Sequence, residues 1–251
     1  MSLTYTTYQA ALSTLTAIPT TDVNFVAILP DVIDYAEQRI YRELSMLVED
    51  VADATSSTTA DSRNFTLPTS IGTFQIVSSV NVITPASTAP ESGTRNPCTP
   101  VSRNVLDMVW PSIVNAVGTD VTGRPELFCY FSQGASIGLD QPGILFGPWP
   151  DATYRVEVIG KIIPAALSAS TTTTFLSTYL PDLFLAASMV FMSGFMRNYG
   201  AQADDPKMAL SWESQYQTLL KSAADWEARK RFAGGSWTSA MVEPTAVPQR
   251  G

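Results

Sequence analysis

The chain of 251 residues has no histidine and only two cysteines. Without histidine, one chain cannot build a Ser-His-Asp or Cys-His nucleophile, and zinc-hydrolase sites that need imidazole are excluded. Two cysteines, Cys98 and Cys129, are too few for a structural zinc site or a disulfide framework. We therefore expect two reduced thiols in or near the core, because free cysteine is usually buried.

Charged residues are scarce as well. They form 15% of the chain, whereas typical domains have about 25%. The net charge is −8 and no segment is strongly basic, which disfavours tight binding of nucleic acid. An acidic surface would instead let double-stranded DNA pass without specific binding. With 25 serines and 28 threonines, uncharged hydroxyl groups supply much of the polar surface, which favours β structure and large contact surfaces.

Long hydrophobic runs are also missing. The longest uncharged apolar stretch is residues 183–196, and a membrane span needs about 20 residues. Residues 1–10 have neither the basic start nor the apolar run of a secretory signal. We expect a soluble protein, assembled in a cytoplasm and without a membrane partner. Its hydrophobic fraction of 45% is enough for one large or two small folded domains.

Apolar residues recur at helical spacing at both ends of the chain. Pro30 is expected as the first residue of a helix, where its missing N–H costs nothing. The predicted helical segments are residues 4–15, a turn at 24–29, and helices at 30–48, 183–198 and 206–232.

Between these ends the sequence changes to short segments in which apolar and polar residues alternate, a pattern typical of strands. The strongest is residues 74–84, with Ile76, Val80 and Val82 on one face and a bulge near Ser78-Ser79. The other predicted strands are residues 65–68, 126–132, 143–146 and 154–163.

The order of these segments predicts an α+β fold, with N- and C-terminal helices forming a bundle and an inserted antiparallel β barrel or sandwich domain. Residues 1–49 and 177–233 would form the bundle and residues 50–176 the β domain. Residues 234–251, which have no periodicity, would form a flexible C-terminal arm.

Sequence motifs give no support for an enzyme. Residues 134–138 match the Gly-x-Ser-x-Gly nucleophile elbow, but a turn follows instead of a helix and no histidine is available. The pair Asp204-Asp205 is best interpreted as a helix cap. Glu49, Asp50 and Asp53 lack the ligand pattern of a calcium loop. We therefore predict no catalytic, cofactor or metal site.

Two features of the helices leave alternatives open. The methionines and phenylalanines around Met189 and Met192 favour a core role over an adaptable contact face. The basic cluster Arg229-Lys230-Arg231 either complements a helix dipole or begins a docking arm. The residues that follow it, Phe232, Trp237 and Met241, suit an arm, and we weigh the two interpretations equally.

Several stretches in this order resemble one protein family. They are residues 24–44, Phe65-Thr66-Leu67-Pro68, Gly147-Pro148-Trp149-Pro150, Thr174-Phe175-Leu176-Ser177 and a late helix with Trp212, Glu213 and Tyr216 in a Trp-Glu-x-x-Tyr pattern. Together they resemble the head-to-tail adaptor (connector or gatekeeper) proteins of short-tailed bacteriophages, similar to tail tubular protein A. No stretch is a catalytic signature, and the shared order carries the resemblance.

The resemblance implies a virion protein at the head-tail junction. It would form a homo-oligomeric ring, commonly of twelve copies, beneath the portal protein, continue the DNA channel, and offer the tail nozzle protein a docking surface, without enzymatic activity or cofactor. We expect β-domain loops to meet the nozzle. Portal docking is assigned to Arg229, Lys230, Arg231, Phe232, Trp237 and Met241, and the subunit interface to Asp34, Glu37, Arg39, Arg42, Trp212 and Tyr216.

Two other classes of function compete with this one. A tail-associated receptor- or carbohydrate-binding module would use the β domain and tryptophans for sugar stacking, but amphipathic helices at both ends are unlike such modules. A cell-wall hydrolase without histidine would need a pair of carboxylates, and the sequence shows no convincing pair.

Overall fold

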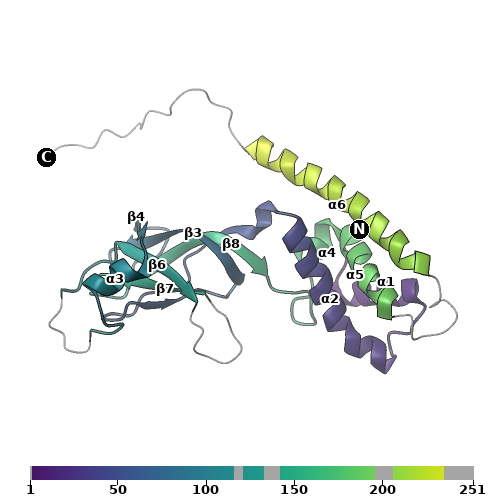
Figure 1. The fold of residues 1–251 in the computed structure, drawn as a ribbon, viewed down its shortest axis with the longest axis horizontal. Helices are drawn as coiled ribbons and strands as arrows, with labels where there is room; N and C mark the ends of the chain where they lie inside the picture. Colours follow the sequence, from purple (N-terminus) through teal and green to yellow (C-terminus); the bar gives the residue numbers. More distant parts are fainter. Residues whose placement is uncertain (1, 116–120, 133–141, 196–205, 235–251) are drawn as a thin grey trace.

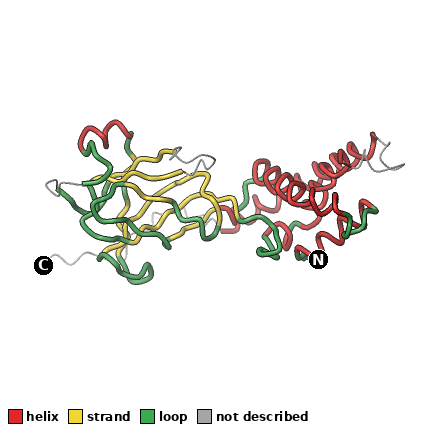
Figure 2. Tube along the Cα trace, turned by 90° about the horizontal axis from the view of Figure 1, so that it is seen from below, coloured by secondary structure: helices red, strands yellow, loops and turns green. Residues whose placement is uncertain are grey.

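The computed structural model of the chain describes residues 2–115, 121–132, 142–195 and 206–234. Figures 1 and 2 show an elongated molecule, with most helices at one end and the strands at the other. In chain order the elements are α1 (Tyr5–Thr16), α2 (Val23–Glu43), η1 (Leu47–Glu49), β1 (Asp50–Asp53), β2 (Asn64–Thr66), β3 (Gly72–Thr84), β4 (Thr94–Pro97), β5 (Thr99–Pro100), α3 (Arg103–Val109), β6 (Leu127–Ser132), β7 (Pro142–Gly147), β8 (Arg155–Pro164), α4 (Phe175–Tyr179), α5 (Pro181–Phe195) and α6 (Pro206–Gly234).

Helix α2 begins earlier than the sequence predicted. Its N-cap is Asp22, whose Oδ1 accepts hydrogen bonds from the backbone N–H groups of Asn24 and Phe25 at 2.9 and 3.0 Å. The prediction that Pro30 starts this helix is wrong, because Pro30 lies inside it. An internal proline removes one backbone hydrogen bond. The carbonyl concerned belongs to Val26, and both residues are exposed, so water can replace the lost donor.

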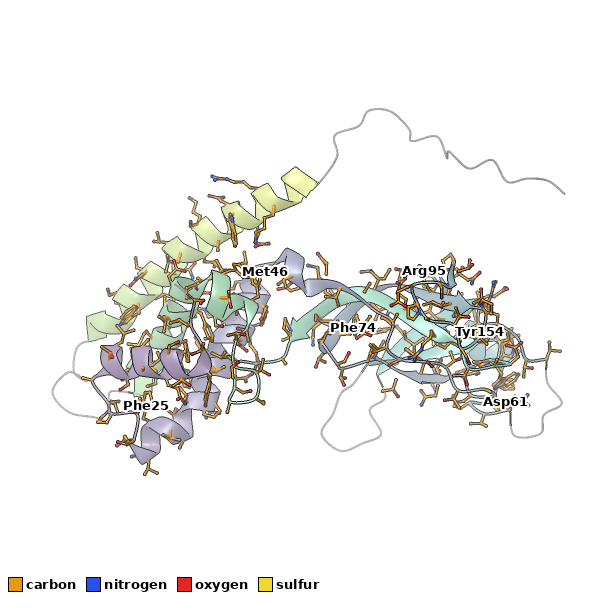
Figure 3. The ribbon with its side chains drawn as sticks, turned by 180° about the vertical axis from the view of Figure 1, so that it is seen from behind. Phe25, Met46, Asp61, Phe74, Arg95 and Tyr154 are labelled. Carbon is orange, nitrogen blue, oxygen red and sulfur yellow. The ribbon has the colours of Figure 1, made fainter. Side chains whose placement is uncertain are left out.

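The helices from the two ends of the chain share one apolar core. Tyr8 of α1 stacks on Phe184 of α5 with ring centroids 4.7 Å apart, and its hydroxyl lies 2.6 Å from the hydroxyl of Ser188. Met189 and Met192 are fully buried in the same cluster, so the prediction that these methionines are core residues is confirmed. Phe25, labelled in Figure 3, is buried in this helical part as well.

The strands form two four-stranded sheets with the orders β1-β8-β3-β4 and β2-β7-β6-β5. Every strand pair is antiparallel except β5 with β6. A second apolar cluster lies between the sheets, with Phe74 and Val156 from one and Phe128 and Phe146 from the other. The predicted α+β fold, with helices at both ends and an antiparallel β region, is confirmed.

Strand β3 contains the bulge expected near Ser78-Ser79, because its register with β8 shifts between Val77 and Ser79. A second shift, between Phe74 and Ile76, changes which side chains face the core. Ile76 is 56% exposed while Val80 and Val82 are buried. The prediction that these three share a face is therefore wrong for Ile76, because an inserted residue reverses the alternation.

Helix α3 covers the outer face of the sheet that contains β6 and β7. Its Leu106 packs against Cys129 and Leu145. Cys129 and Cys98 are free and buried, as predicted. Among the described residues, no helix combines the length and the apolar character that crossing a bilayer requires.

Candidate functional site

A charged cluster joins α2 to α6. The guanidinium of Arg39 donates two hydrogen bonds to the carboxylate of Glu213, at 2.9 and 2.6 Å, and one to Glu43 at 3.2 Å. It also lies over the ring of Tyr216, 4.1 Å from the centroid, and the Tyr216 hydroxyl donates to Glu43 at 2.7 Å. We call these four residues the Arg39 cluster. Its planar, bidentate geometry is one that lysine could not reproduce.

Two groups of the Arg39 cluster have shifted pKa values. Hydrogen bonds from Arg39 lower the pKa of Glu213 below its usual range. Burial, and then the hydrogen bond to Glu43, raise the pKa of Tyr216 well above its usual range. Glu213 is therefore ionised and Tyr216 is protonated at physiological pH, while Arg39 links α2 to α6.

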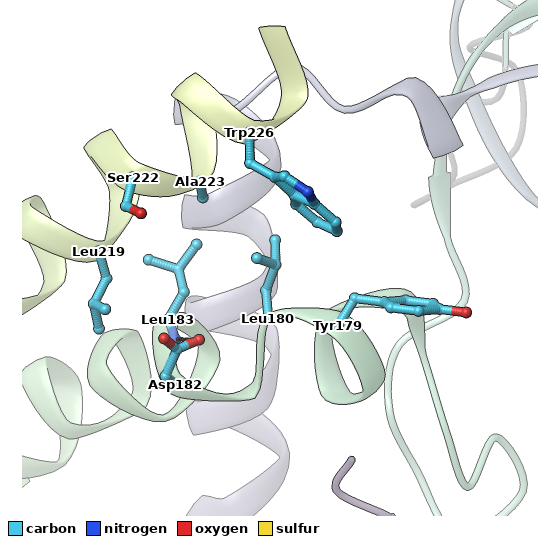
Figure 4. A pocket seen from close by; sticks show the side chains of 8 residues that line it. All are labelled: Tyr179, Leu180, Asp182, Leu183, Leu219, Ser222, Ala223 and Trp226. Carbon is cyan, nitrogen blue, oxygen red and sulfur yellow. Dashed lines mark hydrogen bonds between the residues drawn. The ribbon is translucent and has the colours of Figure 1, made fainter. Parts of the chain in front are cut away.

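Next to this cluster a pocket of about 190 Å³ opens between α4, α5 and α6 (Figure 4). It is lined by Tyr179, Leu180, Asp182, Leu183, Leu219, Ser222, Ala223 and Trp226. Two of its aromatic residues reach solvent, since Tyr179 is 61% and Trp226 38% exposed.

The pocket is suited to one large side chain of a partner. Leu180 and Leu183 point from its floor toward α6, and the carboxylate of Asp182 lies at one side (Figure 4). Aromatic rings and a carboxylate around an apolar floor fit the aliphatic stem and cationic head of Arg or Lys. The arrangement offers recognition and no nucleophile.

The basic end of α6 is partly engaged within the chain. Lys230 Nζ lies 2.6 Å from Glu227 Oε1 and 3.2 Å from the centroid of the Trp226 ring. Glu227 is itself buried, so Lys230 neutralises an internal carboxylate. Arg229 is exposed and remains open to a partner.

Of the four other predicted docking residues, two lie in α6 without described side chains and two lie outside the described residues. Arg231 and Phe232 lie in α6, but their side chains are outside the description. Trp237 and Met241 lie outside the described residues, as do the elbow-like residues 134–138 and the pair Asp204-Asp205.

Both the helical part and the two sheets fall within one family match. Residues 3–241 match the family described as SU10 adaptor protein. The chain belongs to the SU10 adaptor protein family. A comparison with curated proteins finds no match. Membership supports a phage head-tail adaptor, and it does not extend to the narrower likeness to tail tubular protein A.

The adaptor places the six predicted interface residues in different environments. Arg39 and Tyr216 belong to the Arg39 cluster, and Trp212 packs partly buried against the helical core. Asp34 and Arg42 are exposed on α2. Of the six, these last two have charged groups that are exposed to solvent.

Glu37, the sixth predicted residue, is an internal carboxyl group. It is 3% exposed, and its Oε1 accepts a hydrogen bond from the backbone N–H of Leu167 at 3.1 Å. Burial raises its pKa to about 7, against the opposing effect of that hydrogen bond. Glu37 therefore fixes the segment after β8 to α2 and is not available at the surface.

In the β region of the adaptor, the sequence interpretation missed Arg63. This side chain is fully buried. It donates to the carbonyls of Phe146 at 3.0 Å and of Trp110, and to the carboxylate of Asp107 at 3.2 Å. Since Arg63 stands in a polar stretch before a short strand, no local pattern marks it as buried. Arg63 holds α3 and the loop after it against the sheet.

The acidic residues weighed for cation binding have partners of their own. Asp53 accepts hydrogen bonds from Thr55 and Ser70. Lys161 Nζ lies 3.7 Å from carboxylate oxygens of both Glu49 and Asp50. Within the described parts of the adaptor, no group of three or more Cys, Asp or Glu is placed to hold a metal ion.

Proposed function

We propose that the chain is a structural protein of a phage virion that forms a ring beneath the portal, extends the DNA channel and gives the tail nozzle its docking surface. The observation that carries this proposal is the family match over residues 3–241, which includes helices and sheets alike. In this role the protein has no enzymatic activity. Residues 1–49 and 177–233 act as the helical bundle, residues 50–176 as the inserted β domain and residues 234–251 as the arm.

Ring formation uses the exposed face of α2 in this proposal. Asp34 and Arg42 carry opposite charges on that face, and in a head-to-tail contact they pair with oppositely charged groups on a different surface of the next copy. Both side chains are already oriented, because Asp34 accepts hydrogen bonds from Gln38 and Arg42 donates to the Gln38 carbonyl. Family resemblance favours twelve copies.

Portal docking uses the C-terminal half of α6 and the arm. The pocket of Tyr179, Asp182 and Trp226 receives an Arg or Lys side chain of the portal, and exposed Arg229 pairs with an acidic group. Trp237 and Met241 add apolar anchors along the arm, as aromatic residues do in other interfaces.

The remaining roles follow from the β region and the charge. Loops of the β region meet the nozzle. The net charge of −8 per copy disfavours adhesion of DNA phosphates, so the duplex slides through the ring without specific binding.

The test is the mass of the purified chain, alone and mixed with its portal ring, by native mass spectrometry. We expect a monomer that joins the portal in a fixed multiple. A trimer that ignores the portal would contradict the proposal and favour a receptor-binding module. A variant lacking residues 236–251 should lose portal binding, and unchanged binding would overturn the role of the arm.

A further inference from the structure

Helix α3 is apolar on two sides. Its inner side buries Leu106 against the sheet. On its outer side, Val105, Met108 and Val109 are 47%, 83% and 56% exposed. Positions i, i+3 and i+4 share one face of a helix, so these three side chains form a continuous apolar ridge. We call it the α3 ridge. In Figure 2 this helix lies at the end of the molecule farthest from the other helices.

The α3 ridge is held rigidly in place. Arg63 bonds the carbonyl of Trp110, directly after the helix, and the carboxylate of Asp107 within it. Asp107 also pairs with Arg103 one turn earlier, at 3.1 Å. A fixed apolar surface exposed to water is unfavourable unless a partner covers it. The charged groups beside the ridge are paired with one another. We therefore expect the surface of the partner to be apolar and uncharged.

The same chain carries a groove of that chemistry. It has a volume of about 500 Å³ and is lined by Gln75, Ile76, Val77, Ser78, Pro100, Val101, Phe128 and Tyr130. Ile76 and Tyr130 are 56% and 46% exposed. None of its lining residues is charged. We call it the sheet-edge groove.

The groove lies where the edge strands of both sheets are short, and the Tyr130 hydroxyl donates to the Gln75 carbonyl across it at 3.4 Å. Strand β4 pairs with β3 only at residues 81–84, and β5 pairs with β6 only at Leu127 and Phe128. Within the described chain, residues 75–78 of β3 and residues 129–130 of β6 therefore extend beyond their short neighbours. The groove lies between these two strand segments.

Among the described residues nothing covers the α3 ridge or the sheet-edge groove, both are apolar, and a head-to-tail contact joins two different surfaces of one chain. The α3 ridge points outward and is fixed by Arg63, so it cannot fill the groove of its own chain. We infer that the α3 ridge of one copy docks into the sheet-edge groove of the next copy, an inference that rests on the ring of the proposed function. Pro100 and Val101 line the groove and α3 begins at Arg103. The short link fixes the angle between the two surfaces, and a constant angle is needed for a ring to close.

The size of the contact indicates when it forms. Three side chains expose well below the ~800 Å² that each partner contributes to a standard interface. The contact therefore adds to that of α2 and does not alone hold two free copies together. It becomes occupied when copies are brought side by side.

The experiment mixes two variants of the full chain that each add one cysteine, Met108→Cys and Ile76→Cys, and oxidises them after assembly on the portal ring. Because Cys98 and Cys129 are buried, background disulfides are low. We expect a mixed dimer on non-reducing gels only when both variants are present. Asn24→Cys mixed with Ile76→Cys is the control, since Asn24 is exposed at the helical end of the molecule (Figure 1).

The outcomes separate this inference from the proposed function. Met108→Cys dimers formed without the second variant would mean a symmetric α3 contact and would overturn the inference. Fixed-multiple binding to the portal without a mixed disulfide would also overturn it and leave the adaptor role intact. If the chain does not bind the portal, the ring on which this contact rests is absent, and the inference falls with the proposed function. Met108→Glu should reduce ring assembly at least tenfold with an unchanged unfolding midpoint.

Discussion

Arg39 on α2 and Glu213 on α6 are joined by two hydrogen bonds of 2.9 and 2.6 Å although 174 positions separate them in the chain. The pair links the C-terminal helix to the N-terminal part of the protein. Arg39 is largely shielded from solvent, with 13% of its side chain exposed, whereas Glu213 is about one-third exposed. The bond is therefore stronger than a surface ion pair and weaker than a fully buried one.

Replacing Arg39 by Ala should lower the free energy of unfolding by about 1–2 kcal/mol, because hydrogen bonds to charged groups are lost in a partly exposed setting. Arg39→Lys should recover only part of this, since lysine lacks the planar fork. Urea titration measures both. Arg42→Ala, an exposed change on the same helix, should stay within about 0.5 kcal/mol. Equal effects of the Arg39 and Arg42 changes would contradict the role given to the pair.

Arg63→Met should destabilise the β region by about 3–5 kcal/mol, because breaking a buried charge network leaves its partners unpaired. The carbonyls of Phe146 and Trp110 would lose their donor in a buried setting. Thermal unfolding followed by circular dichroism is the measurement. Arg103→Ala is the matched control, as it removes the exposed partner of the same Asp107 and should change little. A stable Arg63→Met protein would show that α3 does not depend on this side chain.

Glu37 should make stability depend on pH. Its pKa is raised from 4.5 to about 7 in the folded chain, so folding favours the protonated form. That stabilisation is fully present below pH 4.5 and is lost as the pH rises through 7. Glu37→Gln imitates the protonated form and keeps an acceptor for Leu167. Between about pH 5 and pH 8 the wild type should lose up to roughly 3 kcal/mol relative to the variant.

The measurement for Glu37 is urea unfolding of both proteins across this range. Asp31→Asn, an exposed change on the same helix, is the control and should leave the pH dependence as it is. Parallel pH profiles of wild type and Glu37→Gln would rule out the raised pKa.

The α4–α6 pocket gives a prediction on binding. Trp226→Ala should weaken binding to the portal ring about tenfold or more, as loss of a central aromatic anchor does. Asp182→Asn should weaken it less and reduce its salt dependence, because one attractive charge is lost. Surface plasmon resonance at two salt concentrations tests both. Lys221→Ala, exposed on the same helix, serves as the control. Portal binding indifferent to Trp226 would remove the pocket from the docking surface.

Both thiols should be inert in the folded protein. Cys98 and Cys129 are 7% and 3% exposed, and burial raises the pKa of Cys98 to about 12. The reactive thiolate is therefore nearly absent at neutral pH. A chromogenic disulfide reagent should report two thiols in urea and almost none in buffer. Rapid reaction without denaturant would mean that one site opens readily.

Local patterns predicted the helices at both ends and most strands, because a 3.6-residue or two-residue spacing records which face is buried. They failed where a distant contact decides the outcome. The bulge that turns Ile76 outward forms in the pairing of β3 with β8, and the adjacent Gly160 has no Cβ that would collide with the Ile76 carbonyl. The sequence around Pro30 does not show that α2 continues through this proline. The helix begins earlier because Asp22 caps it and Phe25 is buried in the core.

The candidate site was less predictable than the fold. Arg39 and Tyr216 were predicted at a subunit interface from the family resemblance, and the structure shows them in contact with each other. Their mutual contact depends on α6 packing against α2, which no spacing within either helix reveals. The burial of the Glu37 carboxyl could not be predicted for the same reason, because its partner Leu167 comes from the segment after β8.

The apolar core of the helical part contains residues from both ends of the chain, which sets an order of events during synthesis. The strands from β1 to β8 leave the ribosome together and can pair before α5 exists. The apolar face of α2 must wait more than a hundred residues for α5 and α6, roughly 10–30 s at bacterial elongation rates. During that interval each nascent chain exposes the α2 surface against which α5 later packs. A stop codon before α5 would therefore produce a chain whose β region can fold while the apolar face of α2 stays exposed to water.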